Sequence, residues 1–131
     1  MRGSGTATVK RPAEIDRMRG AGAILAGILE VLRAELRPGV STGELDAIAE
    51  RMIRDAGAVP SFKGYGSNPP FAGSICASIN DEVVHGIPSP HRRLVDGDLI
   101  SIDIGCILDG WHADCARTWP VGRVPPAVSD R

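Results

Sequence analysis

Two aspartates, Asp103 and Asp114, have the residue type and the spacing to carry out chemistry together. They lie in residues 99–120, LISIDIGCILDGWHADCARTWP, which read as a β-hairpin. Asp109-Gly110 at its centre is the strongest short hairpin signal, since a type I′ turn needs positive φ at both central residues. Apolar and β-branched residues flank the turn, as expected of two strands.

The turn also fixes which residues of the two strands face each other. With Leu108 opposite Trp111, Gly105 falls opposite Asp114, and Asp103 is a diagonal neighbour of Asp114 on the same face. The Cβ atoms of the two aspartates are then expected to lie no more than about 7–8 Å apart. Because glycine has no side chain, we expect open space beside Asp114.

Two carboxylates on rigid strands beside such a space permit three interpretations. They could share divalent cations, for which carboxylate oxygens are suitable ligands. They could form a like-charged pair in which one pKa is raised. They could also be two solvated aspartates on the wet face of an antiparallel sheet. The hairpin alone leaves all three open, although aspartate is uncommon in strands.

The opposite face of the hairpin is almost wholly apolar and needs a cover of helices. Its side chains are Ile102, Ile104, Cys106, Leu108, Trp111, Ala113 and Cys115. Apolar residues at helical spacing predict a helix over residues 12–36, with Pro12 at its first position. The apolar stripe of this helix comprises Ile15, Met18, Leu25, Ile28, Leu32 and Leu36. A capping box of Ser41 and Glu44 predicts a second helix that runs to about Ala56.

The aromatic residues of this chain are concentrated in one segment, residues 58–72, where glycine and proline predict a loop. Phe62, Tyr65 and Phe71 all lie there. Aromatic side chains in such a loop are typical either of a pocket wall or of a cluster that packs the loop itself, and the sequence favours neither.

A second hairpin is predicted from residues 74–79 and 82–85, joined by a turn at Asn80-Asp81. His85 would stand at the end of its strand. A single histidine is usually a structural or surface residue, but a position near the end of a sheet, where sites gather, raises the prospect of a functional one. The elements together predict an α/β (α+β) domain in which two helices cover an antiparallel sheet built from β-hairpins.

Length and composition restrict the class of protein. The chain has 131 residues and a formal net charge of -1, which indicates one domain and argues against nucleic acid as a direct partner. Its apolar runs are too short to span a membrane, and its first residues do not read as a secretory signal. Three cysteines without metal-type spacing favour a reducing compartment, so we expect a cytoplasmic protein.

Three stretches carry a resemblance to a known family: RPGVSTGELD at 37–46, SINDEVVHGIP at 78–88, and DGDLISIDIGCILDGWHADCART at 96–118. On these residues the chain resembles the N-terminal half of the type I methionine aminopeptidases of bacteria, which are peptidases of family M24. The resemblance implies the pita-bread fold, in which two similar halves enclose the active site. It extends over residues 10–122, with a flexible tail at 1–9 and a linker or truncated end at 123–131.

The resemblance implies roles for individual residues. Asp103 and Asp114 match the two metal-binding aspartates of the family, of which the second bridges both metals. His85 matches the histidine that contacts the substrate peptide and assists proton movement, which makes it both a catalytic and a substrate-binding residue. Four residues match the wall of the pocket for the methionine side chain: Phe62, Tyr65, Phe71 and Cys76.

The activity implied by the resemblance is removal of the N-terminal methionine from nascent polypeptides by a metal-activated water. The cofactors would be two divalent cations, and oxygen ligands suit Mn, Fe or Co at least as well as Zn. The partners would be nascent polypeptide N-termini and the ribosome, with no membrane.

The chain departs from the family in length, because the remaining histidine and glutamate ligands of the family come from a second half. We therefore expect the chain to be a fragment of such an enzyme. Two alternatives stay open. One is a non-catalytic, stand-alone half-domain that binds a partner, and the other is a hydrolase of the same fold that acts on Xaa-Pro peptides or resembles creatinase.

Overall fold

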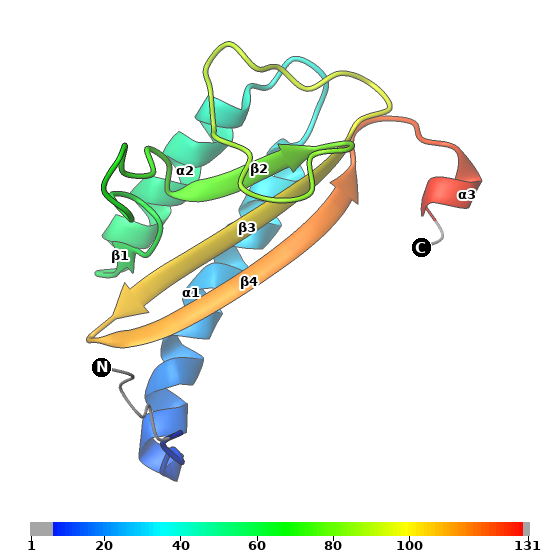
Figure 1. Ribbon diagram of the computed structural model, residues 1–131. Coiled ribbons are helices and arrows are strands. Elements are labelled where there is room, and N and C mark those ends of the chain that lie inside the picture. The colour runs from blue at the N-terminus through cyan, green and yellow to red at the C-terminus, as the bar shows by residue number, and fades with distance from the viewer. Residues whose placement is uncertain (1–6, 130–131) are drawn as a thin grey trace.

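The fold consists of two long helices followed by an antiparallel sheet, seen in the computed structural model, which describes residues 7–129 (Figure 1). The elements in chain order are α1 (Pro12–Glu35), α2 (Thr42–Asp55), β1 (Val59–Pro60), β2 (Ile75–Ile79), β3 (Leu99–Leu108), β4 (Trp111–Pro120) and α3 (Pro126–Ser129). The long strand β3 is central: β4 pairs along one of its edges, while β2 and β1 pair one after the other along the opposite edge.

The hairpin of β3 and β4 has the register that the sequence predicts. Leu108 pairs with Trp111 and Gly105 with Asp114, so Asp103 is the diagonal neighbour of Asp114. Both turn residues have positive φ, as a type I′ turn requires: 49° at Asp109 and 83° at the glycine after it. The hairpin therefore places the two carboxylates on one face.

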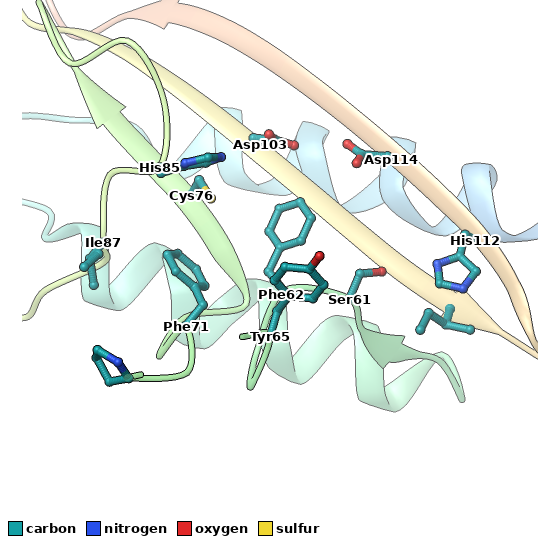
Figure 2. Close-up of a pocket in the computed structure, with 12 residues that line it drawn as sticks. Ser61, Phe62, Tyr65, Phe71, Cys76, His85, Ile87, Asp103, His112 and Asp114 are labelled. Atoms are coloured by element: carbon teal, nitrogen blue, oxygen red, sulfur yellow. The ribbon is translucent and has the colours of Figure 1, made fainter. Parts of the chain in front are cut away.

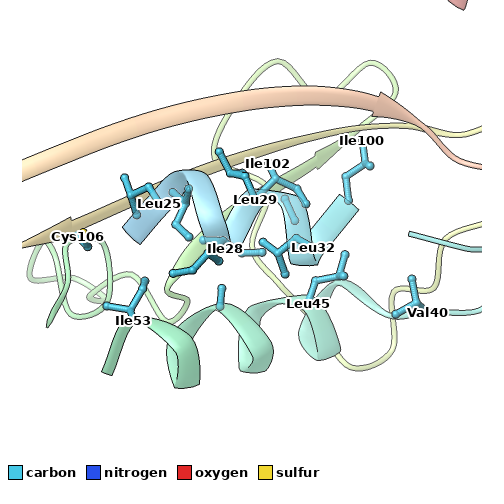
Figure 3. Close-up of a cluster of buried hydrophobic side chains, with 14 of the residues drawn as sticks. Leu25, Ile28, Leu29, Leu32, Val40, Leu45, Ile53, Ile100, Ile102 and Cys106 are labelled. Atoms are coloured by element: carbon cyan, nitrogen blue, oxygen red, sulfur yellow. The ribbon is translucent and has the colours of Figure 1, made fainter. Parts of the chain in front are cut away.

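The helix α1 covers the other face of the hairpin, as predicted, whereas α2 packs beside α1 against β1 and β2 (Figure 3). Leu25, Ile28 and Leu32 of α1 are buried together with Leu45 of α2 and Ile102 of β3. The capping box that begins α2 is present, since the Ser41 side chain accepts from the Glu44 backbone and the Glu44 side chain accepts from the Ser41 backbone. This buried layer holds β3 rigid, and β3 carries Asp103.

The predicted stripe of α1 is wrong in its first two turns. Ile15 is 43% exposed and Met18 is 38% exposed. The helix passes the tip of the hairpin at Gly20, whose position lies against Leu108, and the residues before Gly20 extend beyond the sheet (Figure 1). Helical periodicity continues there without a sheet to cover.

The predicted second hairpin is also wrong. Residues 75–79 do form a strand, β2, but it pairs with β3, and residues 82–85 form no strand. Positive φ values of 56° at Asn80 and 61° at His85 take the backbone out of the extended region. The segment is a loop whose backbone bonds to β2 at Glu82, which donates to the Ile79 carbonyl, and again at Gly86, which accepts from the Ala77 N–H.

Two short elements were not predicted. Val59 and Pro60 form β1 inside the segment expected to be a loop, and they pair with Ile107 and Cys106. Pro126–Ser129 form the short helix α3 within the expected linker. Of the predicted tail, residues 7–9 are exposed without secondary structure, and residues 1–6 lie outside the described part. None of the helices described is long and apolar enough to cross a membrane.

Candidate metal and substrate site

The two aspartates of the hairpin lie side by side on its polar face, one on β3 and one on β4 (Figure 2). Burial raises the pKa of Asp103 above the ordinary aspartate value, and the negative charge of Asp114 raises it further, while His85 opposes the shift. This result favours a like-charged pair over two fully solvated aspartates.

A cation fits this pair better than any group the chain itself places there. The Oδ1 atom of Asp103 is buried and has no hydrogen-bond partner within the described part of the chain. A buried carboxylate oxygen without a partner is costly, and a divalent cation would supply both a ligand bond and the opposite charge. Residues 7–129 nevertheless contain no group of three or more His, Cys, Asp or Glu side chains able to hold a metal, so the pair is an incomplete set of ligands.

The carboxylate pair opens into a cavity of about 830 Å³, within the range typical of small-molecule sites. All seven site residues expected from the sequence line this cavity. The lining residues are Ser61, Phe62, Tyr65, Pro69, Phe71, Cys76, His85, Ile87, Asp103, Ile107, His112 and Asp114. The structure thus brings together residues from β2, β3, β4 and two loops.

The expectation of open space at Gly105 is wrong. A Cβ atom there would lie 3.1 Å from Cε1 of Phe62 and 3.2 Å from Oγ of Ser61. The Ser61 backbone N–H also donates to the Gly105 carbonyl at 3.1 Å. The aromatic loop is therefore seated on the hairpin directly across from Asp114, and the missing side chain of Gly105 makes room for it.

The aromatic residues of the loop form a wall of the cavity (Figure 2). Backbone hydrogen bonds close the loop on itself, since Tyr65 N–H donates to the Phe62 carbonyl and Phe71 N–H donates to the Tyr65 carbonyl. Lys63 pairs with Glu50 at 2.6 Å and so ties the loop to α2. The loop therefore combines both predicted arrangements: it is packed on itself and it lines the cavity.

Cys76 supplies a buried thiol to the same cavity. Its burial, followed by the charges of Asp103 and Asp114, raises the pKa of the thiol to about 11. The side chain therefore stays protonated at neutral pH and is not a nucleophile, because the thiolate is the reactive form. Its contribution to the site is a polarisable, apolar wall.

The two histidines at the cavity come from different elements of the fold. In Figure 2, His85 lies beside Cys76, next to Asp103, whereas His112 lies at the far end of the cavity. His112 comes just after the hairpin turn and pairs with Ile107 across the strands. His85 therefore lies beside Asp103, and His112 lies two positions before Asp114 on β4.

The sequence profile of metallopeptidase family M24 matches residues 16–131. The chain belongs to this family. It is 56% identical over 115 residues to methionine aminopeptidase 1 of Bacillus subtilis, covering 88% of this chain and 45% of that protein. It is 50% identical over 127 residues to methionine aminopeptidase 1 of Mycobacterium tuberculosis, covering 97% and 47%.

The crystal structure of methionine aminopeptidase from Rickettsia prowazekii superimposes with a TM-score of 0.88 at 33% identity, covering 94% of this chain and 48% of that one. The M24 chain therefore has the architecture of one half of the pita-bread fold, as expected from the sequence. It spans about half the length of the curated relatives that it matches.

Two residues of this M24 chain that matter for the site were not found from the sequence. Ser61 lines the cavity, but only its contact with Gly105, far along the chain, reveals it. Asp46 lies on α2 and accepts hydrogen bonds from the backbone N–H groups of Ser74 at 2.7 Å and Ile75 at 3.0 Å. Asp46 thereby fixes the start of β2, the strand that carries Cys76, and no local pattern indicates this.

Replacing Asp46 is expected to change the pH dependence of stability. Burial raises the pKa of its carboxyl, with Glu50 adding to the shift and the two backbone donors and Lys63 opposing it. The folded chain therefore holds this proton more tightly than the unfolded chain. Its contribution to the free energy of unfolding is full below the ordinary aspartate pKa of about 3.9 and is lost as pH rises through the raised pKa.

Asp46→Asn keeps an accepting oxygen and should remove the loss of stability with rising pH. Asp46→Ala leaves two buried donors unpaired and should lower the free energy of unfolding by about 1–3 kcal/mol. Urea unfolding at about pH 3.5 and about pH 7 measures both effects. Asp55→Asn, at an exposed position of the same helix, is the control. An Asp46→Asn chain with the pH dependence of the wild type would contradict the assignment.

Proposed function

We propose that this chain supplies one half of the active site of a methionine aminopeptidase. The observation that carries the proposal is that Asp103, whose buried Oδ1 has no hydrogen-bond partner among the described residues, lines the same cavity as the aromatic loop. The names of the relatives support removal of an N-terminal methionine as the reaction. Residues 10–122 would form this half, and residues 123–131 would be the linker or truncated end.

Asp103 and Asp114 would hold two divalent cations, with Co, Mn, Fe or Zn as candidates. When bound, such cations lower the pKa of a water and polarise the peptide carbonyl. The chain itself contributes negative charge at neighbouring positions on two paired strands. The further ligands would come from residues outside this chain, because the described residues supply only this pair.

The side chain of an N-terminal methionine would enter the cavity between Phe62, Tyr65 and Phe71, with Cys76 behind them. Aromatic rings and a neutral thiol suit a thioether, which is apolar and polarisable. His85, exposed beside Asp103, would hydrogen-bond the substrate peptide and move a proton near the scissile bond. Nascent polypeptides are the proposed substrates, at the ribosome in the cytoplasm, which agrees with the three free cysteines.

The test uses the protein extended to the length of its relatives. We expect it to release methionine from Met-Ala-Ser peptides and to leave Ala-Pro peptides intact. His85→Ala is expected to lower kcat by about 10²–10⁴-fold, the usual contribution of a general acid or base, with metal content unchanged. His91→Ala, at an exposed histidine of the next turn along the chain, is the matched control. Faster cleavage of the Ala-Pro peptide would contradict the proposed substrate. An equal loss of kcat in both histidine variants would contradict the proposed role of His85.

A further inference from the structure

Gly86, the residue after His85, is locked onto the backbone of β2. A Cβ atom at this position would lie 2.1 Å from the carbonyl oxygen of Ala77 and 2.9 Å from Cα of Ser78. The Gly86 carbonyl accepts from the Ala77 N–H at 2.9 Å. Its own N–H donates to Oγ of Ser78 at 3.1 Å. Glycine is required here because the two backbones touch.

The loop is also held at Glu82, which pairs with Arg92 and whose N–H donates to the Ile79 carbonyl at 3.2 Å, whereas residues 83–85 make no hydrogen bond in the described chain. Val83 is 87% exposed and Val84 is 61% exposed, and both His85 and Ile87 are exposed, whereas Gly86 between them is buried. His85 also has a φ of 61°, a left-handed conformation that few residues other than glycine adopt. The position of the imidazole is therefore set by the anchoring of Gly86 and not by packing of the ring.

Ser78 provides the one side chain in this anchor. It lies on β2 with 4% of its surface exposed, and its hydroxyl accepts the Gly86 N–H inside the protein. Without that acceptor the buried N–H would be unpaired, which costs more than an ordinary hydrogen bond gains. Ser78 does not contribute to the lining of the cavity in the described chain, so it reaches a substrate only through the residue that it anchors.

We propose that Ser78 is a positioning residue for His85: its hydroxyl holds the Gly86 N–H and thereby fixes the left-handed backbone that presents the imidazole beside Asp103. The inference rests on the role of His85 in the proposed function. It adds a residue, on a different element, whose effect on the reaction is exerted through one hydrogen bond.

The experiment measures two things by NMR on the labelled chain: amide hydrogen exchange of Gly86 and the ring signals of His85. Ser78→Ala is expected to speed exchange of the Gly86 amide on the order of tenfold, as loss of one hydrogen bond does. It is also expected to move the His85 ring signals. Ser78→Thr keeps the hydroxyl and should leave both measurements near those of the wild type. Ser74→Ala is the matched control, since this buried hydroxyl has no partner in the described structure.

A functional readout accompanies these spectra. In the protein extended to family length, Ser78→Ala is expected to lower kcat with KM and metal content unchanged, and Ser78→Thr to restore it. Unmoved His85 signals or an unchanged kcat, despite an exposed Gly86 amide, would overturn the proposal. The proposal would also be overturned by a Ser78→Thr chain that has the Tm of the wild type but the Gly86 exchange rate, His85 signals and kcat of Ser78→Ala.

Two further measurements keep the outcomes distinct. If Ser78→Ala no longer unfolds cooperatively, the same measurements are made on Ser78→Cys. Its thiol is only a weak acceptor, so this variant also weakens the hydrogen bond from the Gly86 N–H. If His85→Ala leaves turnover unchanged, the proposed role of His85 fails, while the exchange rate of Gly86 still reports whether Ser78 anchors the loop.

Discussion

Mn²⁺ titrated into the 131-residue chain is expected to bind, and replacing Asp103 and Asp114 together by asparagine is expected to abolish that binding. The two carboxylates share one face of the hairpin, and the buried Oδ1 of Asp103 has no partner in the described structure. Losing two direct ligands should lower affinity by more than the about 10–100-fold that loss of a ligand's hydrogen-bond partner costs. Calorimetric titration measures the loss.

The control for charge is Asp109→Asn, on the turn of the same hairpin. Asp109 has a φ of 49°, which asparagine adopts well, so this variant removes a negative charge without disturbing the fold. We expect it to bind Mn²⁺ like the wild type. Equal affinity in the wild type and the double variant would show that these carboxylates are not the ligands. A wild-type chain that takes up no Mn²⁺ at about 10 mM, above the range of the weakest carboxylate sites, would contradict the prediction outright.

The single variant Asp114→Asn is expected to stabilise the metal-free chain. Burial and the charge of Asp114 both raise the pKa of Asp103, so at neutral pH the ionised pair opposes folding. Removing one charge relieves the repulsion and should raise Tm, and the increase should disappear at a pH below the ordinary aspartate pKa. The same substitution should cost turnover in the extended protein, a trade between stability and function.

Gly86→Ala is expected to be among the most destabilising single substitutions in this chain. The added Cβ would lie 2.1 Å from the Ala77 carbonyl oxygen and 2.6 Å from its carbon, and neither atom can move without distorting β2. We expect a loss of about 3 kcal/mol or more in the free energy of unfolding, at the upper end for overpacking. Urea unfolding measures it, and the His85 ring signals should move as well.

Gly27→Ala is the opposite control. Gly27 lies within α1 and nothing approaches its Cβ position within 4 Å. Alanine there should stabilise the chain by about 0.8–1 kcal/mol through helix propensity alone. A Gly86→Ala chain with the unfolding midpoint of the wild type would mean that the loop after β2 does not rest on the strand.

Local sequence was sufficient to predict the hairpin of β3 and β4, because a two-residue turn fixes the register of every pair beyond it. The capping box of α2 was also predictable from local sequence, because its two interacting residues are three positions apart. The apolar face of the hairpin is covered by a helix because burying apolar surface away from water is favourable.

Two of the wrong predictions, the second hairpin and the open space at Gly105, involve contacts between distant parts of the chain. Glu82–His85 have the composition of a strand, but β3 is the partner that β2 takes, and the left-handed backbone at Asn80 and His85 is visible only in the folded chain. The space at Gly105 is filled by Ser61 and Phe62, which precede it by about forty residues. Long-range packing of this kind overrides local pattern.

The packing of Phe62 over Gly105 has a thermodynamic consequence. The ring that borders the proposed methionine pocket touches the strand position that faces Asp114. A side chain that moves Phe62 would therefore also change the surroundings of the carboxylates, and a cation held by Asp114 would change the charge next to the ring. The binding free energies of the proposed peptide and cation would then be coupled through this contact, and by linkage each ligand would alter the affinity of the other by the same factor.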